Sequence, residues 1–163
     1  MSVAGNSDYC IVYLASPRLR KQGDVPRLDA LASSLASARA CLPKMPPVVV
    51  FHEDYVAEDF ARLGEVANSG IAFHPVDFSG HEEDFVRHRR DKGYMLMCRF
   101  FSGIVQAHGA LASYAHYMRL DDDSFFINPR MSQESLDRMV AADYAYRQIY
   151  FEPGQEQEDL YDF

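Results

Sequence analysis

Three consecutive aspartates, Asp121, Asp122 and Asp123, have the residue type and spacing to do chemistry in this 163-residue chain. Ionised carboxylates this close repel one another, so they need a cation or another compensating partner. In a tight turn, the i, i+2 spacing of Asp121 and Asp123 aims both carboxylates at one hard cation, with Asp122 pointing elsewhere. Mg²⁺ or Mn²⁺ suits such oxygen ligands and binds through one or two carboxylates plus substrate phosphates. The triplet therefore predicts a metal-bridged diphosphate site.

Two other interpretations of the triplet stand beside this one. An acidic, solvated turn can use Ser124 or an aspartate to satisfy loose backbone groups. The largely apolar runs on both sides of the triplet, at 117–120 and 125–126, argue against a mere surface turn. A phosphotransferase can use Asp121 as its nucleophile. It is disfavoured because the triplet follows the fourth expected strand and no glycine-rich phosphate loop is apparent.

Strand-like and helix-like segments alternate along the chain before the triplet. Strands are expected at 9–15, 48–51, 71–76 and 114–120, where apolar, β-branched and aromatic residues gather. Helices are expected at 28–42, stopped by Pro43, and from an N-cap at Asp54 through Val66. This order predicts an α/β fold with a mostly parallel sheet flanked by helices. The triplet then lies at the carboxyl ends of the strands, where such sheets bind ligands.

The remaining elements are less regular. A long helix is expected over 81–108, with Gly93 as a point where it can break. After the triplet we expect a short strand at 125–127, a helix from an N-cap at Ser132 through Val140, and a last strand at 144–151. Residues 1–153 are expected to form one domain, and residues 154–163 a loose acidic tail.

Charge and cysteine content narrow the classes of partner. Lysine and arginine number 16 against 24 aspartates and glutamates, a net charge of −8, which argues against a nucleic-acid partner. Three cysteines are a poor disulfide framework, so Cys10 and Cys98 are expected to be buried free thiols. We expect no signal peptide and no membrane segment in this sequence.

Residues 93–103 (GYMLMCRFFSG) resemble the Y-x-x-M-C-R-F-x-S-G segment of glycosyltransferase family 15, the fungal α-1,2-mannosyltransferases that make O-linked and N-linked mannose chains. Residues 114–126 (YAHYMRLDDDSFF) are similar to the next segment of that family, Y-x-Y-Y-W-R-V-E-P-x-V-x-F-F, and the gap between the two also matches. The resemblance covers nearly the whole chain, although only residues 94–126 are specific.

The resemblance implies a GT-A-type nucleotide-diphospho-sugar transferase fold, with the C-terminal part of that fold missing from this chain. It implies GDP-mannose as donor, a glycan or glycoprotein hydroxyl as acceptor, and Mn²⁺ (or Mg²⁺) as cofactor. Asp121 and Asp123 would serve the metal, with Asp121 also near the donor diphosphate, and Arg18, Tyr94 and Arg119 would contact the donor. Each of these three has an alternative: an exposed arginine at Arg18, a core aromatic at Tyr94, and an internal ion-pair partner of the aspartates at Arg119.

Two departures from the family pattern limit what the resemblance implies. The family usually carries Glu-Pro-Asp where this chain has an Asp-Asp-Asp triplet, so the metal role is kept while donor and acceptor stay open. In the family, the acidic residue discussed as nucleophile lies downstream of the position of Phe163, so we assign no catalytic residue. Glu152 aligns with a family position after the triplet, but nothing in the sequence gives it a catalytic role. A nucleotide-sugar-binding module without turnover is therefore the competing hypothesis. Family members are anchored in the Golgi, and the location of this chain stays open.

Overall fold

The computed structural model describes residues 9–16, 25–68, 70–79, 92–127 and 132–142. Three of the sequence predictions lie outside these ranges and stay predictions. They are the donor contact at Arg18, the strand at 144–151 and the acidic tail at 154–163.

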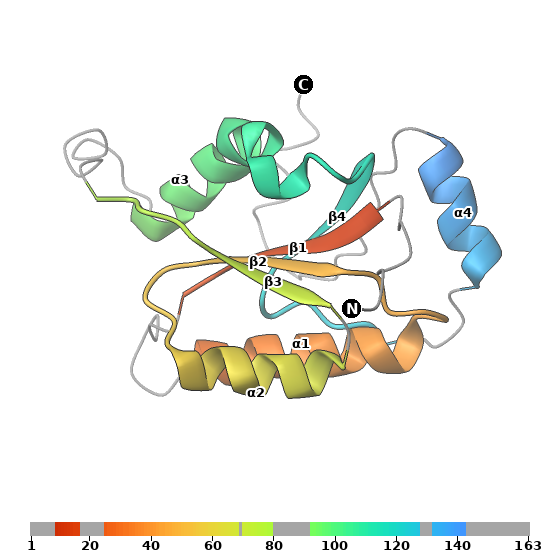
Figure 1. Ribbon diagram of the computed structural model, residues 1–163, viewed down its shortest axis with the longest axis horizontal. Helices are drawn as coiled ribbons and strands as arrows, with labels where there is room; N and C mark the ends of the chain where they lie inside the picture. The colour runs from red at the N-terminus through yellow and green to blue at the C-terminus, as the bar shows by residue number, and fades with distance from the viewer. Residues whose placement is uncertain (1–8, 17–24, 69, 80–91, 128–131, 143–163) are drawn as a thin grey trace, which may run out of the picture.

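Four parallel strands form the sheet in the described part of the chain (Figure 1). They are β1 (Tyr9–Ala15), β2 (Val48–His52), β3 (Ile71–Pro75) and β4 (His116–Leu120). Their order is β3-β2-β1-β4, and every neighbouring pair is parallel. Each strand matches a predicted one to within two residues. The predicted α/β class with a parallel sheet is therefore confirmed.

Helices cover both faces of the sheet (Figure 1). On one face lie α1 (Arg27–Cys41) and α2 (Ala57–Ala67), and on the other lies α3 (Lys92–Arg99). A further helix, α4 (Gln133–Ala141), contributes Leu136 to the same core as β1. Because alternate side chains of a strand point to opposite faces, the continuous apolar runs of β1 and β2 supply both cores.

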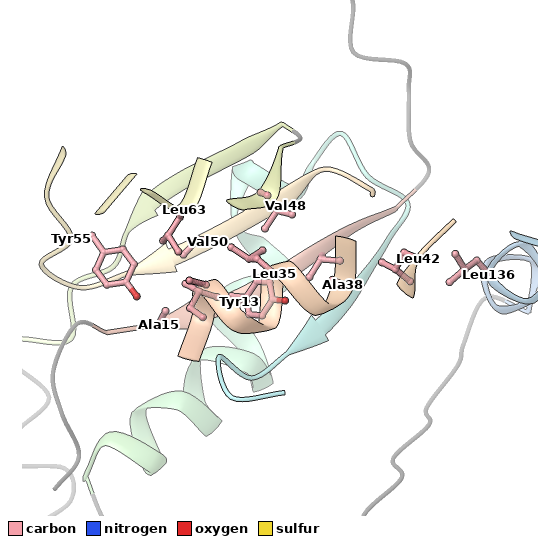
Figure 2. Close-up of a cluster of buried hydrophobic side chains, with 14 residues drawn as sticks. Tyr13, Ala15, Leu35, Ala38, Leu42, Val48, Val50, Tyr55, Leu63 and Leu136 are labelled. Carbon is pink, nitrogen blue, oxygen red and sulfur yellow. The ribbon is translucent and has the colours of Figure 1, made fainter. Parts of the chain in front are cut away.

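The core under α1 and α2 is the larger of the two (Figure 2). Tyr13 and Val50 of the sheet meet Leu35 of α1 and Leu63 of α2, and all four are fully buried. Tyr55 lies at one end of this cluster in the view of Figure 2, and Leu136 lies at the other. This core fixes the rotation of α1 about its axis, which decides where the polar side chains of that helix point.

The boundaries of the helices confirm most of the sequence signals. Helix α1 ends at Cys41, just before Pro43, and Ser132 caps α4 by accepting a hydrogen bond from the Ser135 amide at 3.1 Å. The predicted N-cap at Asp54 is wrong. Asp54 lies before the helix with a left-handed φ of 57°, and the N-cap is Val56. The Val56 amide instead donates to the Asp59 carboxylate at 3.0 Å, so an acid inside the first turn replaces the expected cap.

The long helix expected over 81–108 is described only from Lys92. Gly93 lies inside α3 and does not break it. The helix instead widens to π-helical hydrogen bonding at Phe100–Ile104 (η2), then tightens to a 3₁₀ turn at Val105–Ala107 (η3), with a second at Gly109–Leu111 (η4). Both Phe100 and Phe101 are buried in this widened turn. No described helix is long and apolar enough to cross a membrane.

The cysteine predictions are half right. Cys10 is a fully buried free thiol, and burial raises its pKa to about 12. Cys98 is also a free thiol, but it is only half-buried, so the prediction that it is buried is wrong. Its helix α3 lies on the outer layer, and the buried positions of that segment fall at Leu96 and Phe100.

Histidines gather near the carboxyl ends of β2 and β3. His52 is buried and stacks on Tyr55 with 5.3 Å between ring centroids, whereas His74 lies 5.5 Å from the ring of His108. Burial lowers the pKa of His52, His74 lowers it further, and nearby carboxylates partly oppose the shift. Burial and then His108 lower the pKa of His74. Both rings are therefore neutral in the folded chain at neutral pH.

We expect the free energy of unfolding to fall as the pH drops below about 6.5, the ordinary histidine value. The unfolded state binds protons there while His52 and His74 still resist them, so stability is fully present above that pH. Urea unfolding at pH 7.5, 6.5 and 5.5 measures the slope. The variant His74→Asn should reduce it, and an unchanged slope in that variant would contradict the assignment.

Candidate functional site

The three aspartates lie where the order of the strands reverses. From β1 the chain proceeds to β2 and β3 on one side, and β4 then lies on the other side of β1 (Figure 1). In open α/β sheets, the crevice outside the carboxyl ends at such a reversal binds ligands. Asp121 follows the last residue of β4 at once, and a hydrogen bond from the Ser124 amide to the Asp121 carbonyl at 2.9 Å closes the turn. We call residues 121–124 the aspartate turn.

The aspartate turn separates its three carboxylates into one buried and two exposed groups. Asp122 is only 1% exposed and forms an ion pair with Arg27. The side chains of Asp121 and Asp123 are 49% and 56% exposed. Two carboxylates spaced i, i+2 are therefore left accessible at the surface, and the one between them is buried.

Arg27 is the partner that sequence reasoning missed. It is the first residue of α1, and its side chain is 15% exposed. One guanidinium nitrogen, Nη2, pairs with Asp122, and the other, Nη1, lies 3.5 Å from Asp123 Oδ2. A cation at a helix N-terminus is unfavourable to the helix dipole, so this arginine needs nearby carboxylates. That mismatch is a sequence signal that could have drawn attention to Arg27, although it does not identify the partner.

Helix α1 also holds the chain that leaves the aspartate turn. Ser34 donates to the Ser124 carbonyl at 2.5 Å, and Ser37 accepts from the Phe126 amide at 3.0 Å. The Cys41 thiol donates to the Phe126 carbonyl at 3.4 Å. We call Arg27, Ser34, Ser37 and Cys41 the α1 polar stripe, because their spacing places them along one side of the helix.

The short strand predicted at 125–127 is wrong. The described residues after the aspartate turn form no strand, and the backbone of Phe126 is bonded to Ser37 and Cys41 of α1. Buried backbone groups must find partners, and side chains of a helix satisfy them as well as a neighbouring strand does. The aromatic pair that looked like a strand instead belongs to an irregular segment bonded to the α1 polar stripe.

Two phenols lie beneath the turn. Because Ser34 gives its proton to the Ser124 carbonyl, the Tyr13 hydroxyl donates to Ser34 Oγ, at 2.9 Å. Burial raises the pKa of Tyr13 to about 12, and the nearby Asp122 carboxylate raises it too. Burial, followed by Asp122, also raises the pKa of Tyr55. Both hydroxyls therefore stay protonated at neutral pH.

Arg119 joins the aspartate turn to the opposite layer. Its Nη2 lies 3.0 Å from Asp121 Oδ1 and 3.7 Å from Met97 Sδ, and its guanidinium lies 4.0 Å from the Phe101 ring centroid. Of the two interpretations of Arg119, the internal ion pair is present in the structure. The side chain remains partly exposed, so this pairing leaves a donor contact open.

The other predicted donor contacts are placed as follows. Tyr94 lies on α3 and is 45% exposed, so the alternative of a core aromatic is wrong. Arg18 lies outside the described residues. The structure thus brings together Arg119, Asp121 and Asp123, adds Arg27 to them, and leaves Tyr94 accessible on the helix across the sheet from α1.

The metal ligands that the aspartate turn offers are fewer than a hard divalent cation needs from protein alone. The described residues contain no group of three or more histidines, cysteines and carboxylates that could hold a metal ion. Asp121 and Asp123 supply two exposed carboxylates, which is the number that Mg²⁺ or Mn²⁺ takes when substrate phosphates and water complete the shell. The residues therefore fit a metal that arrives with a diphosphate rather than one held by protein alone.

Comparisons with known proteins support the fold. No family model and no curated protein matches the sequence. The structure is similar to core-mannan synthase A of Aspergillus fumigatus, crystallised in a Mn/GDP form, with a TM-score of 0.63 and 16% identity over 88% of this chain. It is also similar to the mannosyltransferase Ktr4p of S. cerevisiae, with a TM-score of 0.54 and 18% identity over 74% of this chain. The matches span 42% and 33% of those chains. The likeness shows that the chain has the GT-A-like α/β fold of these mannosyltransferases.

We expect Ser34→Ala to lower the free energy of unfolding by about 1–3 kcal/mol, since it leaves the Tyr13 hydroxyl and the Ser124 carbonyl without this partner. Urea denaturation measures the change. Ser33→Ala is the matched control, because Ser33 is the exposed neighbour on the same helix. Equal stability of the two variants would show that the α1 polar stripe does not hold the turn.

Proposed function

We propose that the chain is a metal-dependent glycosyltransferase of family 15, which transfers mannose from GDP-mannose to a hydroxyl of a glycan or glycoprotein. The observation that carries this proposal is the pair of exposed carboxylates, Asp121 and Asp123, at the reversal of the strand order. It is supported by the fold, which is that of a synthase crystallised with manganese and GDP. Residues 1–153 are proposed to form one nucleotide-sugar-binding domain.

In this function each residue of the aspartate turn has its own role. Asp121 and Asp123 hold Mn²⁺ or Mg²⁺, which when bound stabilises the charge that grows on the leaving diphosphate. Asp122 keeps the turn seated through its buried pair with Arg27. Arg119 orients the Asp121 carboxylate. Arg18 and Tyr94 contact the donor, as the resemblance to the family implies.

A second candidate is a nucleotide-sugar-binding module without turnover. The observation that favours it is the composition of the described site, which holds carboxylates and arginines suited to a metal and a diphosphate. The aspartate turn and its arginines account for donor and metal binding, whereas no described residue is argued to act on the acceptor hydroxyl. The two candidates share the aspartate turn and differ in whether the bound sugar is transferred.

We expect Asp123→Ala to abolish Mn²⁺-dependent binding of GDP, since it removes one of the two exposed carboxylates. Isothermal titration calorimetry with GDP, in the presence of Mn²⁺ and in its absence, measures this. Asp137→Ala on α4 is the control, because it removes an exposed carboxylate elsewhere on the chain. Binding by Asp123→Ala as tight as by the wild type would remove the metal role.

We expect the purified chain to transfer mannose from GDP-mannose to a mannoside acceptor in the presence of Mn²⁺, and Asp123→Ala to abolish the transfer. Product formation and GDP release are measured in the same assay. Binding of GDP-mannose with neither transfer nor hydrolysis would instead support the binding module.

A further inference from the structure

We propose that Arg27 is a positioning residue for the metal-binding carboxylates, and that it acts by holding Asp122 and Asp123 on one guanidinium group. This inference rests on the proposed function, in which Asp123 binds the metal. It gives a role in that site to a residue of α1 that lies far from the aspartate turn in sequence and that neither the D-x-D spacing nor the family resemblance singles out.

Asp122 is the fixed point of this arrangement. Its carboxylate is almost completely buried and pairs with Nη2 of Arg27, which is itself largely buried. A charged pair in this setting is held in place, because separating it leaves an uncompensated charge away from water. The guanidinium plane therefore has little freedom to move once Asp122 is in place.

Asp123 is the more exposed partner that this fixed group reaches. Its carboxylate is more than half exposed, and Nη1 of Arg27 lies 3.5 Å from Oδ2. The guanidinium group is planar and rigid, so anchoring one of its nitrogens also fixes the position of the other. The pairing of Nη2 with Asp122 therefore restricts the carboxylate that Nη1 contacts, which is that of Asp123. Arg27 contacts Asp123 through Oδ2, and in the proposed function the other oxygen, Oδ1, binds the cation.

The backbone behind Arg27 is equally well fixed. Arg27 opens α1, where the amides of Asp29 and Ala30 donate to the Pro26 carbonyl at 2.9 and 3.0 Å. One turn further along the helix, Leu31 is fully buried in the core under the sheet. Carboxylates that bind metals are commonly held by hydrogen bonds from a surrounding layer of residues. Arg27 is such a supporting residue for Asp123, and it is held on the rigid helix α1.

Two variants test this inference. Arg27→Lys keeps a positive charge beside Asp122, but a single ammonium group lacks the fork that spans two carboxylates. The double variant Arg27→Met/Asp122→Leu replaces the buried pair by apolar side chains, a change that leaves many folds as stable as before. We expect both to lose about 10- to 100-fold in Mn²⁺-dependent affinity for GDP, the usual cost of removing a group that orients a metal ligand.

The matched control is Arg62→Gln. Arg62 of α2 pairs with Asp29 of α1 at 2.5 Å. The substitution therefore also removes an arginine–aspartate pair that involves α1, but this pair is exposed and contains no residue of the aspartate turn. Calorimetry with GDP and Mn²⁺ is combined with thermal unfolding for every variant. The control should bind as the wild type does, and the double variant should melt close to the wild type while binding weakly.

Each outcome is decisive. A wild-type chain that binds no GDP with Mn²⁺ overturns the proposed function and this inference with it. A wild type that binds, together with Arg27→Lys and the double variant binding within about twofold of it, overturns the role of Arg27 alone. If only the double variant folds, its affinity decides. If neither variant folds, Arg27 serves stability only and the inference is overturned.

Discussion

The buried carboxylate of Asp122 is the constraint on which the arrangement at the carboxyl edge depends. Moving one ionised carboxylate out of water costs on the order of several kcal/mol unless it is paired. Its partner, Arg27, comes from the start of α1, whereas Asp122 follows β4. The residues after β4 and the first residue of α1, which are remote in sequence, must therefore lie side by side in the folded chain. The aspartate turn is thereby tied to the helical layer as well as to the sheet.

The path of the chain beyond the turn depends on the same contact. Once Asp122 is paired with α1, the next residues run beside that helix, and their backbone groups need partners there. Ser34 and Ser37 supply them, and Cys41 completes the set one turn later. An interior side of α1 that carries hydroxyls rather than leucines is costly in an apolar core. It is retained in this helix because each hydroxyl is bonded to the segment that leaves the turn.

Sequence patterns predicted the parts of this structure that depend on local order. Continuous apolar runs located β1 to β4, and the triplet directly after β4 placed the candidate site at the carboxyl edge. Resemblance to a family added the GT-A-like fold. Arg27 was not predictable in this way, since 96 positions separate it from Asp123 and no local pattern selects a partner at that distance.

The errors have the same origin, because each prediction used a local signal where a remote or competing contact decided. The aromatic residues at 125–127 have the composition of a strand, but their backbone partners lie on a helix. Asp54 is a good capping residue, yet Asp59 bonds the amide that needed a cap. Tyr94 sits in an apolar run, and its exposure depends on which side of α3 faces the sheet.

Two arginines reach the aspartate turn from opposite layers of the molecule. Arg27 comes from α1 on one face, and Arg119 lies against Phe101 on the other. Three carboxylates and two guanidiniums leave the turn with a small negative charge, so mutual repulsion is reduced while a cation is still attracted. A bound divalent ion would make the net charge positive, which suits an anionic diphosphate. In the proposed function, the turn is therefore balanced so that metal and nucleotide favour each other's binding.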